Sequence, residues 1–102
     1  MLQLRPNCEG CGKALPPNAA DARICSYECT FCADCVATLL DNVCPNCGGG
    51  FAPRPIRPVA EWRPGVCLAK QPASTDPVHL KWDRADIAAF SRRLRDIPPE
   101  RR

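Results

Sequence analysis

The sequence predicts a small α+β fold that is stabilised by bound metal and followed by a proline-rich arm and a C-terminal helix. Three observations predict it. Eight of the nine cysteines lie in the first 47 of the 102 residues, as four close pairs. Six prolines fall between residues 51 and 77. Beyond them, apolar residues recur at helical spacing until a double proline at residues 98–99.

The cysteine pairs have the spacing of metal ligands. Two residues between sulfurs allow one tight turn to present both thiolates to the same ion, and four thiolates complete a tetrahedral structural zinc site. Eight thiolates therefore predict two Zn²⁺ per chain. Because cysteine fills every coordination position, no position is open for a substrate, which argues against metal-based catalysis. The pairs are Cys8/Cys11, Cys25/Cys29, Cys32/Cys35 and Cys44/Cys47.

Two other uses of clustered cysteines are weaker. Disulfides are typical of short secreted chains, but the N-terminus lacks the apolar run of a signal peptide, and Cys67 would be left over. The spacing Cys25-x3-Cys29-x2-Cys32 is similar to the cluster-binding loop of radical S-adenosylmethionine enzymes, yet 102 residues cannot build the large barrel of those enzymes. With no apolar segment long enough to span a membrane, we expect a reducing, cytoplasmic location.

Sequence order permits two ways of sharing the ions. In a sequential arrangement, the first two pairs hold one zinc and the last two hold the other. In a cross-brace, the first and third pairs form site 1, and the second and fourth form site 2. Site 1 would then contain Cys8, Cys11, Cys32 and Cys35, and site 2 would contain Cys25, Cys29, Cys44 and Cys47.

Local chemistry favours the cross-brace. A glycine follows both Cys11 and Cys47, as in zinc knuckles, because glycine adopts positive φ without steric cost. Cys35 leads into apolar residues at positions 36, 39, 40 and 43, a spacing that indicates a short helix. A knuckle joined to a helix start is the treble-clef arrangement. The sequential pairing also joins a knuckle to a helix, so spacing leaves both open.

Residues 8–47 resemble a RING-type zinc finger, with Cys29 in place of the usual histidine. The CPNC ending at residues 44–47 and Phe31 before the fifth ligand match that pattern. The resemblance implies a possible ubiquitin-ligase-like activity, which would need an aliphatic residue after the first cysteine, an aromatic residue before the last pair and a basic residue after the last cysteine. This chain has Glu9, no aromatic residue in 36–43, and Gly48, which weakens the ligase interpretation.

The chain also resembles a small bacterial family of cysteine-rich proteins of unknown function, whose members begin MLxLRPNC and contain ARICSxECTFCxDC and CPNCGG. These segments match at residues 1–8, 22–35 and 44–49. The resemblance covers about residues 1–58. It implies the fold but no activity.

Charge is divided along the chain. Residues 1–50 carry a net charge of −2 and residues 51–102 a net charge of +5. Eight thiolates and two zinc ions would bring the first half to about −6, a poor surface for polyphosphate. Nucleic-acid binding is therefore expected only through the second half, at Arg92, Arg93 and Arg95, although no aromatic residues interleave there for base stacking.

Three segments are expected: a two-zinc module at 1–50, a proline-rich extended arm at 51–82 and an amphipathic helix at 83–97. The glycines at 48–50 are expected to form a flexible joint. Phe51, Ile56 and Val59 are expected to cover the first helix. Asp83 is the expected cap of the last helix, and its apolar stripe is Ile87, Phe90, Leu94 and Ile97.

No nucleophile–base pair, paired acids or phosphate-binding loop is present, so the sequence predicts a protein without catalytic activity. Cys67 is expected to be a buried apolar side chain, His79 not to be a ligand, and Trp62 and Trp82 to anchor the arm to the core. The favoured function is a zinc-binding module that binds a protein partner. The alternatives are nucleic-acid binding, ligase-like activity, and zinc or redox sensing.

Overall fold

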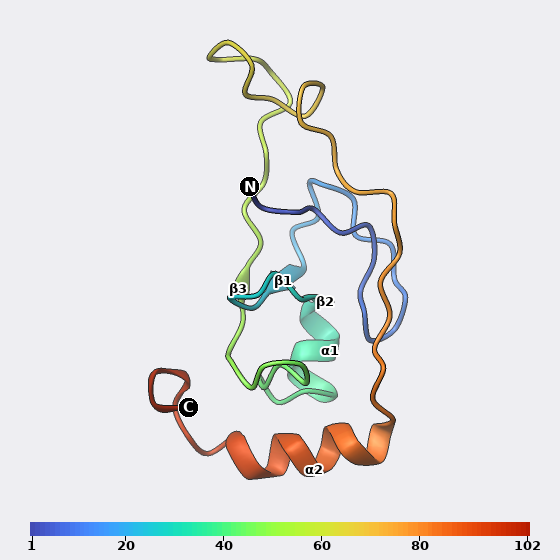
Figure 1. Cartoon of the computed structure of the whole chain (residues 1–102), viewed down its shortest axis with the longest axis vertical. Helices are drawn as coiled ribbons and strands as arrows, with labels where there is room; N and C mark the ends of the chain where they lie inside the picture. Colours follow the sequence, from blue (N-terminus) through green and yellow to red (C-terminus); the bar gives the residue numbers. More distant parts are fainter.

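A three-stranded antiparallel sheet and two helices organise the computed structural model, which describes residues 1–102 (Figure 1). The strand order is β2-β1-β3, with Arg23 opposite both Phe31 and Pro53. No helix has the length and apolar character needed to cross a membrane. The elements are β1 (Ala22–Ile24), β2 (Thr30–Cys32), α1 (Ala33–Thr38), β3 (Ala52–Pro53), α2 (Arg84–Leu94) and the 3₁₀ turn η1 (Pro99–Arg101).

The hairpin of β1 and β2 carries three of the cysteines into position. Its turn is closed by two backbone hydrogen bonds, from the Cys25 N–H to the Cys29 carbonyl and from the Glu28 N–H to the Cys25 carbonyl, with Glu28 at φ 66°. Strand β2 is buried along its whole length and runs directly into α1. Cys32 caps that helix, since its sulfur accepts the Cys35 backbone N–H at 3.5 Å. The junction between strand and helix therefore places the third cysteine pair.

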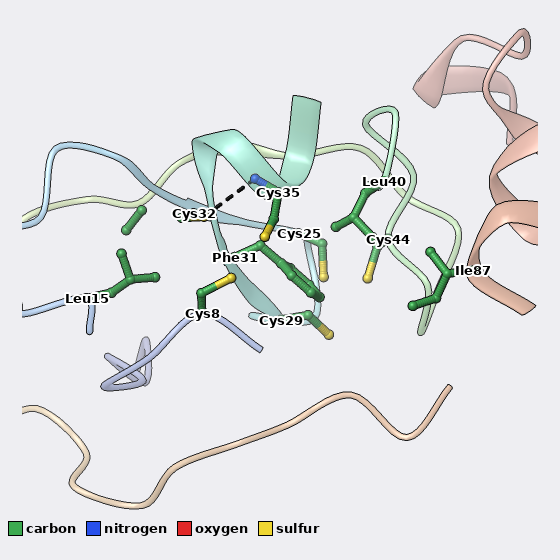
Figure 2. Packing of buried hydrophobic residues seen from close by; sticks show 11 residues of the cluster. Cys8, Leu15, Cys25, Cys29, Phe31, Cys32, Cys35, Leu40, Cys44 and Ile87 are labelled. Atoms are coloured by element: carbon green, nitrogen blue, oxygen red, sulfur yellow. Dashed lines mark hydrogen bonds between the residues drawn. The ribbon is translucent and has the colours of Figure 1, made fainter. Parts of the chain in front are cut away.

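The core is small and rich in sulfur. Phe31 is fully buried at its centre, and Phe51 meets it edge-to-face with ring centroids 5.4 Å apart. Figure 2 shows Phe31 surrounded by cysteine side chains, with Leu15 and Leu40 farther out. Six of the eleven residues in the buried cluster are cysteines. Apolar burial of this extent gives little stability by itself, so bound metal would have to supply much of it.

The proline-rich arm docks onto the cysteine-rich half through its arginines. Arg54 is only 4% exposed, and its guanidinium donates to the backbone carbonyls of Arg5, Leu15 and Pro16 at 2.9, 3.2 and 2.9 Å. Arg57 donates to the carbonyl of Leu2. Phe51 packs edge-on against Phe31 in the core. Ile56 is exposed and does not cover the first helix, since neighbouring side chains in an extended segment point to opposite faces and Arg57 takes the inner one.

Farther along, the chain projects outward and then returns. Residues 58–71 form a lobe at the end of the molecule opposite α2 (Figure 1). Val59 and Trp62 lie on this lobe and are exposed, so the expectation that they pack on the core was wrong for both. The returning segment runs beside the N-terminus, where the Asn7 amide exchanges two hydrogen bonds with the backbone of Val78.

Helix α2 begins after Asp83, whose carboxylate accepts the Asp86 backbone N–H at 2.9 Å. The helix buries Ile87 and Ser91, and the Ser91 hydroxyl donates to the Leu40 carbonyl. It ends at Leu94 rather than at Ile97, which corrects the expected boundary. Proline disfavours helical backbone in the residue before it, so the chain leaves the helix ahead of Pro98.

Candidate metal centres

The cysteine sulfurs gather in two groups. In the first, the sulfurs of Cys8, Cys11, Cys32 and Cys35 all lie within 4.8 Å of one another. In the second, the sulfurs of Cys25, Cys44 and Cys47 do the same. The first and third pairs thus meet in one place, and Cys25 of the second pair meets the fourth pair in another. In Figure 2 the sulfurs of Cys8 and Cys35 face each other, apart from those of Cys25 and Cys44.

Cys29 lies beside the second group rather than within the common 4.8 Å range. Its neighbourhood lowers the pKa of the Cys25 thiol and raises that of the Cys44 thiol. Figure 2 shows the Cys25 and Cys44 sulfurs side by side, with the Cys29 side chain below them and its sulfur pointing away. The Asn46 side-chain amide also donates to the Cys29 sulfur at 3.5 Å. The structure thus brings together three of the four sulfurs expected for site 2 and leaves Cys29 outside that group.

Two turns present the outer pairs with the same backbone pattern. In the first turn, the Cys8 N–H donates to the Lys13 carbonyl at 2.8 Å, and the Gly12 N–H donates to the Cys8 carbonyl at 2.9 Å. In the second turn, the Cys44 N–H donates to the Gly49 carbonyl at 2.8 Å, and the Gly48 N–H donates to the Cys44 carbonyl at 2.7 Å. Gly12 and Gly48 have φ of 78° and 81°, the conformation that glycine adopts without cost. These are the two knuckles that the sequence predicts.

Backbone N–H groups point at several of the sulfurs. Tyr27 donates to the Cys25 sulfur at 3.3 Å, and Gly49 donates to the Cys47 sulfur at 3.4 Å. The Cys35 backbone N–H donates to the Cys32 sulfur, so each sulfur group receives at least one backbone donor. Hydrogen bonds of this kind stabilise thiolate over thiol and orient the sulfur lone pairs, as second-shell bonds do around metal ligands.

The electrostatics of the two groups fit a divalent cation. Burial raises the pKa of the Cys35 thiol, and the neighbouring thiols of Cys25 and Cys29 raise that of Cys44. Several thiolates this close repel one another, and a bound cation would replace this electrostatic repulsion with attraction between each thiolate and the ion. Soft sulfur donors without carboxylates suit zinc rather than calcium or magnesium. The residues present therefore fit zinc, which would add structural cross-links.

Glu9 occupies the position after the first cysteine, where a RING ligase would need an aliphatic residue. Its carboxylate is buried, pairs with the Arg5 guanidinium at 2.7 Å and accepts the Thr30 backbone N–H. The hydrogen bond from Thr30 joins the first knuckle to β2. A buried charge pair therefore stands where that recognition surface requires an apolar side chain.

The glycines after the second knuckle are a contact surface and not a flexible joint. Gly48 is buried beneath α2, and a Cβ built on it would lie 3.0 Å from Leu94 Cδ1. A Cβ on Gly50 would lie 2.9 Å from Pro99. Arg102 adds hydrogen bonds to the carbonyls of Asn42 and Gly48, at 2.8 and 3.1 Å. Helix α2 and the C-terminal tail therefore close over this knuckle.

We expect Gly48→Ala to destabilise the protein more than Gly12→Ala. Both substitutions place alanine at positive φ, which costs about 1–2 kcal/mol. Only the Gly48 methyl also meets α2, because the space around Gly12 is open. Thermal unfolding of the metal-loaded variants measures the difference. Equal losses would show that α2 does not press on this knuckle.

Asn46 links the second group to the C-terminal half. It donates to the Cys29 sulfur and accepts the Trp82 indole N–H at 3.0 Å. Nothing in the sequence indicates this role, since 36 residues separate Asn46 from Trp82. His79 is exposed and belongs to neither sulfur group, although it lines a groove that also contains Cys11.

The basic residues of α2 have different surroundings. Arg95 pairs with Asp41 at 3.3 Å, so it docks on the cysteine-rich half. Arg92 is exposed, and Arg93 lies with its guanidinium 6.0 Å from the centre of the Phe90 ring. A nucleic-acid contact would therefore depend on Arg92 and Arg93.

Comparisons with known proteins identify relatives. A family described as "Protein of unknown function (DUF1272)" matches residues 1–57. "Uncharacterized protein R02474" of Rhizobium meliloti (strain 1021) is 55% identical over 75 residues, which cover 74% of this chain and 82% of the relative. No solved structure matches. The family match covers both sulfur groups and ends before the lobe and α2.

Proposed function

This chain belongs to the DUF1272 family of proteins of unknown function, and we propose that it is a zinc-binding, non-enzymatic module that binds a protein partner. The observation that carries the proposal is the interleaved grouping of the cysteine pairs. Two ions held in this way would tie the first knuckle to α1 and the β1–β2 turn to the second knuckle. The chain would then present a rigid surface despite its small core.

The proposed coordination is a cross-braced, RING-like treble clef. Site 1 consists of Cys8, Cys11, Cys32 and Cys35, and site 2 consists of Cys25, Cys29, Cys44 and Cys47. Supporting features are the two knuckles and the start of α1 at Cys32. With four thiolates at each ion, neither site offers a position for substrate, which is why we propose a structural role for the metal.

Native mass spectrometry, with an absorption spectrum of the same sample, tests the metal assignment. We expect two zinc ions per chain and no visible absorbance. One zinc per chain would contradict the double site. Bound iron with visible absorbance would overturn the structural role and point to electron transfer or sensing.

Zinc binding is expected to weaken as the pH falls. Thiols must lose their protons to coordinate, so protons and zinc compete for the same sulfurs. Affinity therefore falls progressively on acidification, and zinc binding in weakly buffered solution releases protons. A zinc indicator dye followed across a pH titration measures the release. Affinity that does not change with pH would exclude thiolate coordination.

The partner role is supported by the surface beside α2. A groove of about 240 Å³ runs between the second knuckle and this helix, with Trp82 and Phe90 in its walls. Affinity capture with the zinc-loaded full chain should recover a partner that Phe90→Ala fails to retain. Recovery by both proteins would exclude this groove as the binding surface.

One observation favours sensing as a second candidate. Each sulfur group has one member exposed to solvent, Cys11 in the first and Cys47 in the second. Exposed thiolates are the ones that oxidants reach first. Sensing predicts reversible zinc release under mild peroxide, whereas a purely structural site would keep its metal under the same conditions.

A further inference from the structure

The lobe of residues 58–71 holds a tryptophan away from the rest of its own chain. Trp62 is 82% exposed, with exposed Val59 and Val66 on the same lobe. A hydrogen bond from the Leu68 N–H to the Pro58 carbonyl, at 2.9 Å, closes the base, and Cys67 is buried within. The lobe is thus a built structure that exposes apolar side chains, a feature typical of an interaction surface.

A groove of matching character lies at the opposite end of the molecule. It runs between the second knuckle and α2 and has a volume of about 240 Å³, comparable to one large aromatic side chain. Its walls are mainly apolar and aromatic, and one carboxylate stands among them. The lining residues are Pro45, Asn46, Trp82, Asp86, Ile87 and Phe90.

The charges of the two surfaces are opposite. Residues 58–71 carry Arg63 and Lys70 against Glu61, a net charge of +1, and the Glu61 carboxylate is turned to the Gly65 N–H of its own lobe. Asp86 is the charged residue that lines the groove, and neither Arg63 nor Asp86 takes part in any of the three ion pairs in the chain. Thiolates of a zinc-loaded second knuckle would add negative charge beside the groove. Complementary charges of this kind orient an encounter between two surfaces.

We propose that the lobe of one copy of this chain binds the groove of a second copy, with Trp62 inserted between Trp82 and Phe90 and Arg63 near Asp86. The molecule is 46 Å long, and the lobe and α2 lie at its two ends (Figure 1). Two copies in antiparallel orientation form both contacts at once, which closes a two-fold dimer. This inference rests on the proposed interaction role and names the partner.

Analytical ultracentrifugation of the zinc-loaded full chain over a concentration series tests the dimer. We expect a concentration-dependent monomer–dimer equilibrium, which Trp62→Ala weakens by about tenfold or more. Tyr27→Ala is the matched control, because Tyr27 is a 71% exposed aromatic residue outside both surfaces. Its dimer should be as stable as that of the unmodified chain.

A charge exchange tests the register of the contact. Arg63→Glu and Asp86→Arg should each weaken the dimer, and the double variant should recover most of the lost affinity. The helix cap is not affected, because Asp86 contributes its backbone N–H to Asp83 and not its carboxylate. Absence of recovery would overturn the proposed pairing of Arg63 with Asp86.

The outcomes separate this proposal from the proposed function. A chain that binds two zinc ions and stays monomeric at all concentrations overturns self-association and leaves the zinc module intact. A dimer that survives Trp62→Ala overturns this interface. Assemblies larger than a dimer overturn the closed two-fold pairing. Failure to bind zinc is seen separately by native mass spectrometry, and in that case the proposed module itself is wrong.

Discussion

Removal of metal with a strong chelator is expected to unfold the whole cysteine-rich half, with loss of the β-sheet and α1. Structural zinc sites contribute about 10–16 kcal/mol of apparent binding free energy, which rivals or exceeds the 5–15 kcal/mol that stabilises a typical domain. The core cannot compensate, because six of the eleven buried cluster members are cysteines. Circular dichroism and amide NMR spectra, recorded before and after chelation, measure the change.

The ninth cysteine supplies the control for this prediction. Cys67 is buried in the lobe and belongs to neither sulfur group. Cys67→Ser should keep two zinc ions and lose only about 1–3 kcal/mol, the usual cost of burying a hydroxyl without a full set of partners. Cys8→Ser should lose one ion and the local structure around the first site. If the chelated chain keeps its native spectrum, apolar packing and not metal stabilises the fold.

Loss of the second site is expected to release α2, whereas loss of the first is not. The helix and the tail rest on the second knuckle through Gly48, which lies under Leu94, and through the bonds from Arg102. We expect Cys47→Ser to reduce hydrogen-exchange protection of residues 84–102 by about tenfold or more relative to Cys11→Ser. Native mass spectrometry should show one ion lost from each variant.

Cys11 and Cys47 make a matched pair because both are exposed, so serine at either position disturbs little packing. Trp82 offers a second readout. Its indole donates to Asn46 in the second knuckle, so its fluorescence, recorded in a Trp62→Phe background, should shift more in Cys47→Ser than in Cys11→Ser. Equal release of α2 in both variants would show that the helix depends on the fold as a whole and not on the second site.

The features that the sequence predicts well are those with local causes. A glycine after a CxxC turn is needed because the turn requires positive φ, and both Gly12 and Gly48 adopt it. Asp83 caps α2 because an aspartate side chain reaches an N–H three residues ahead. The end of α2 has a local cause as well, because Pro98 and Pro99 have no N–H to donate to the carbonyls of Leu94 and Arg95.

The exposure of the lobe and the docking of the arm depend on contacts between distant residues. Arg54 reaches carbonyls 38 to 49 residues away, and Asn7 pairs with Val78 across 71 residues. The sequence shows only that Arg54 lies among prolines, and this pattern fits a solvated linker as well as it fits a docked arm. Trp62 and Phe51 are both aromatic residues of the same arm, yet only Phe51 meets an aromatic partner in the core.

For this protein, the sequence by itself determined which residues are suited to bind metal, where the knuckles turn and where α2 begins. Spacing within a turn and the preferences of single residues suffice for these features. The tertiary structure alone decided which sulfurs come together, because two pairings satisfy the same spacing and the hairpin of β1 and β2 selects between them. It also placed α2 on the second knuckle, where Leu94 and Phe90 lie over Gly48, more than forty residues away in the sequence.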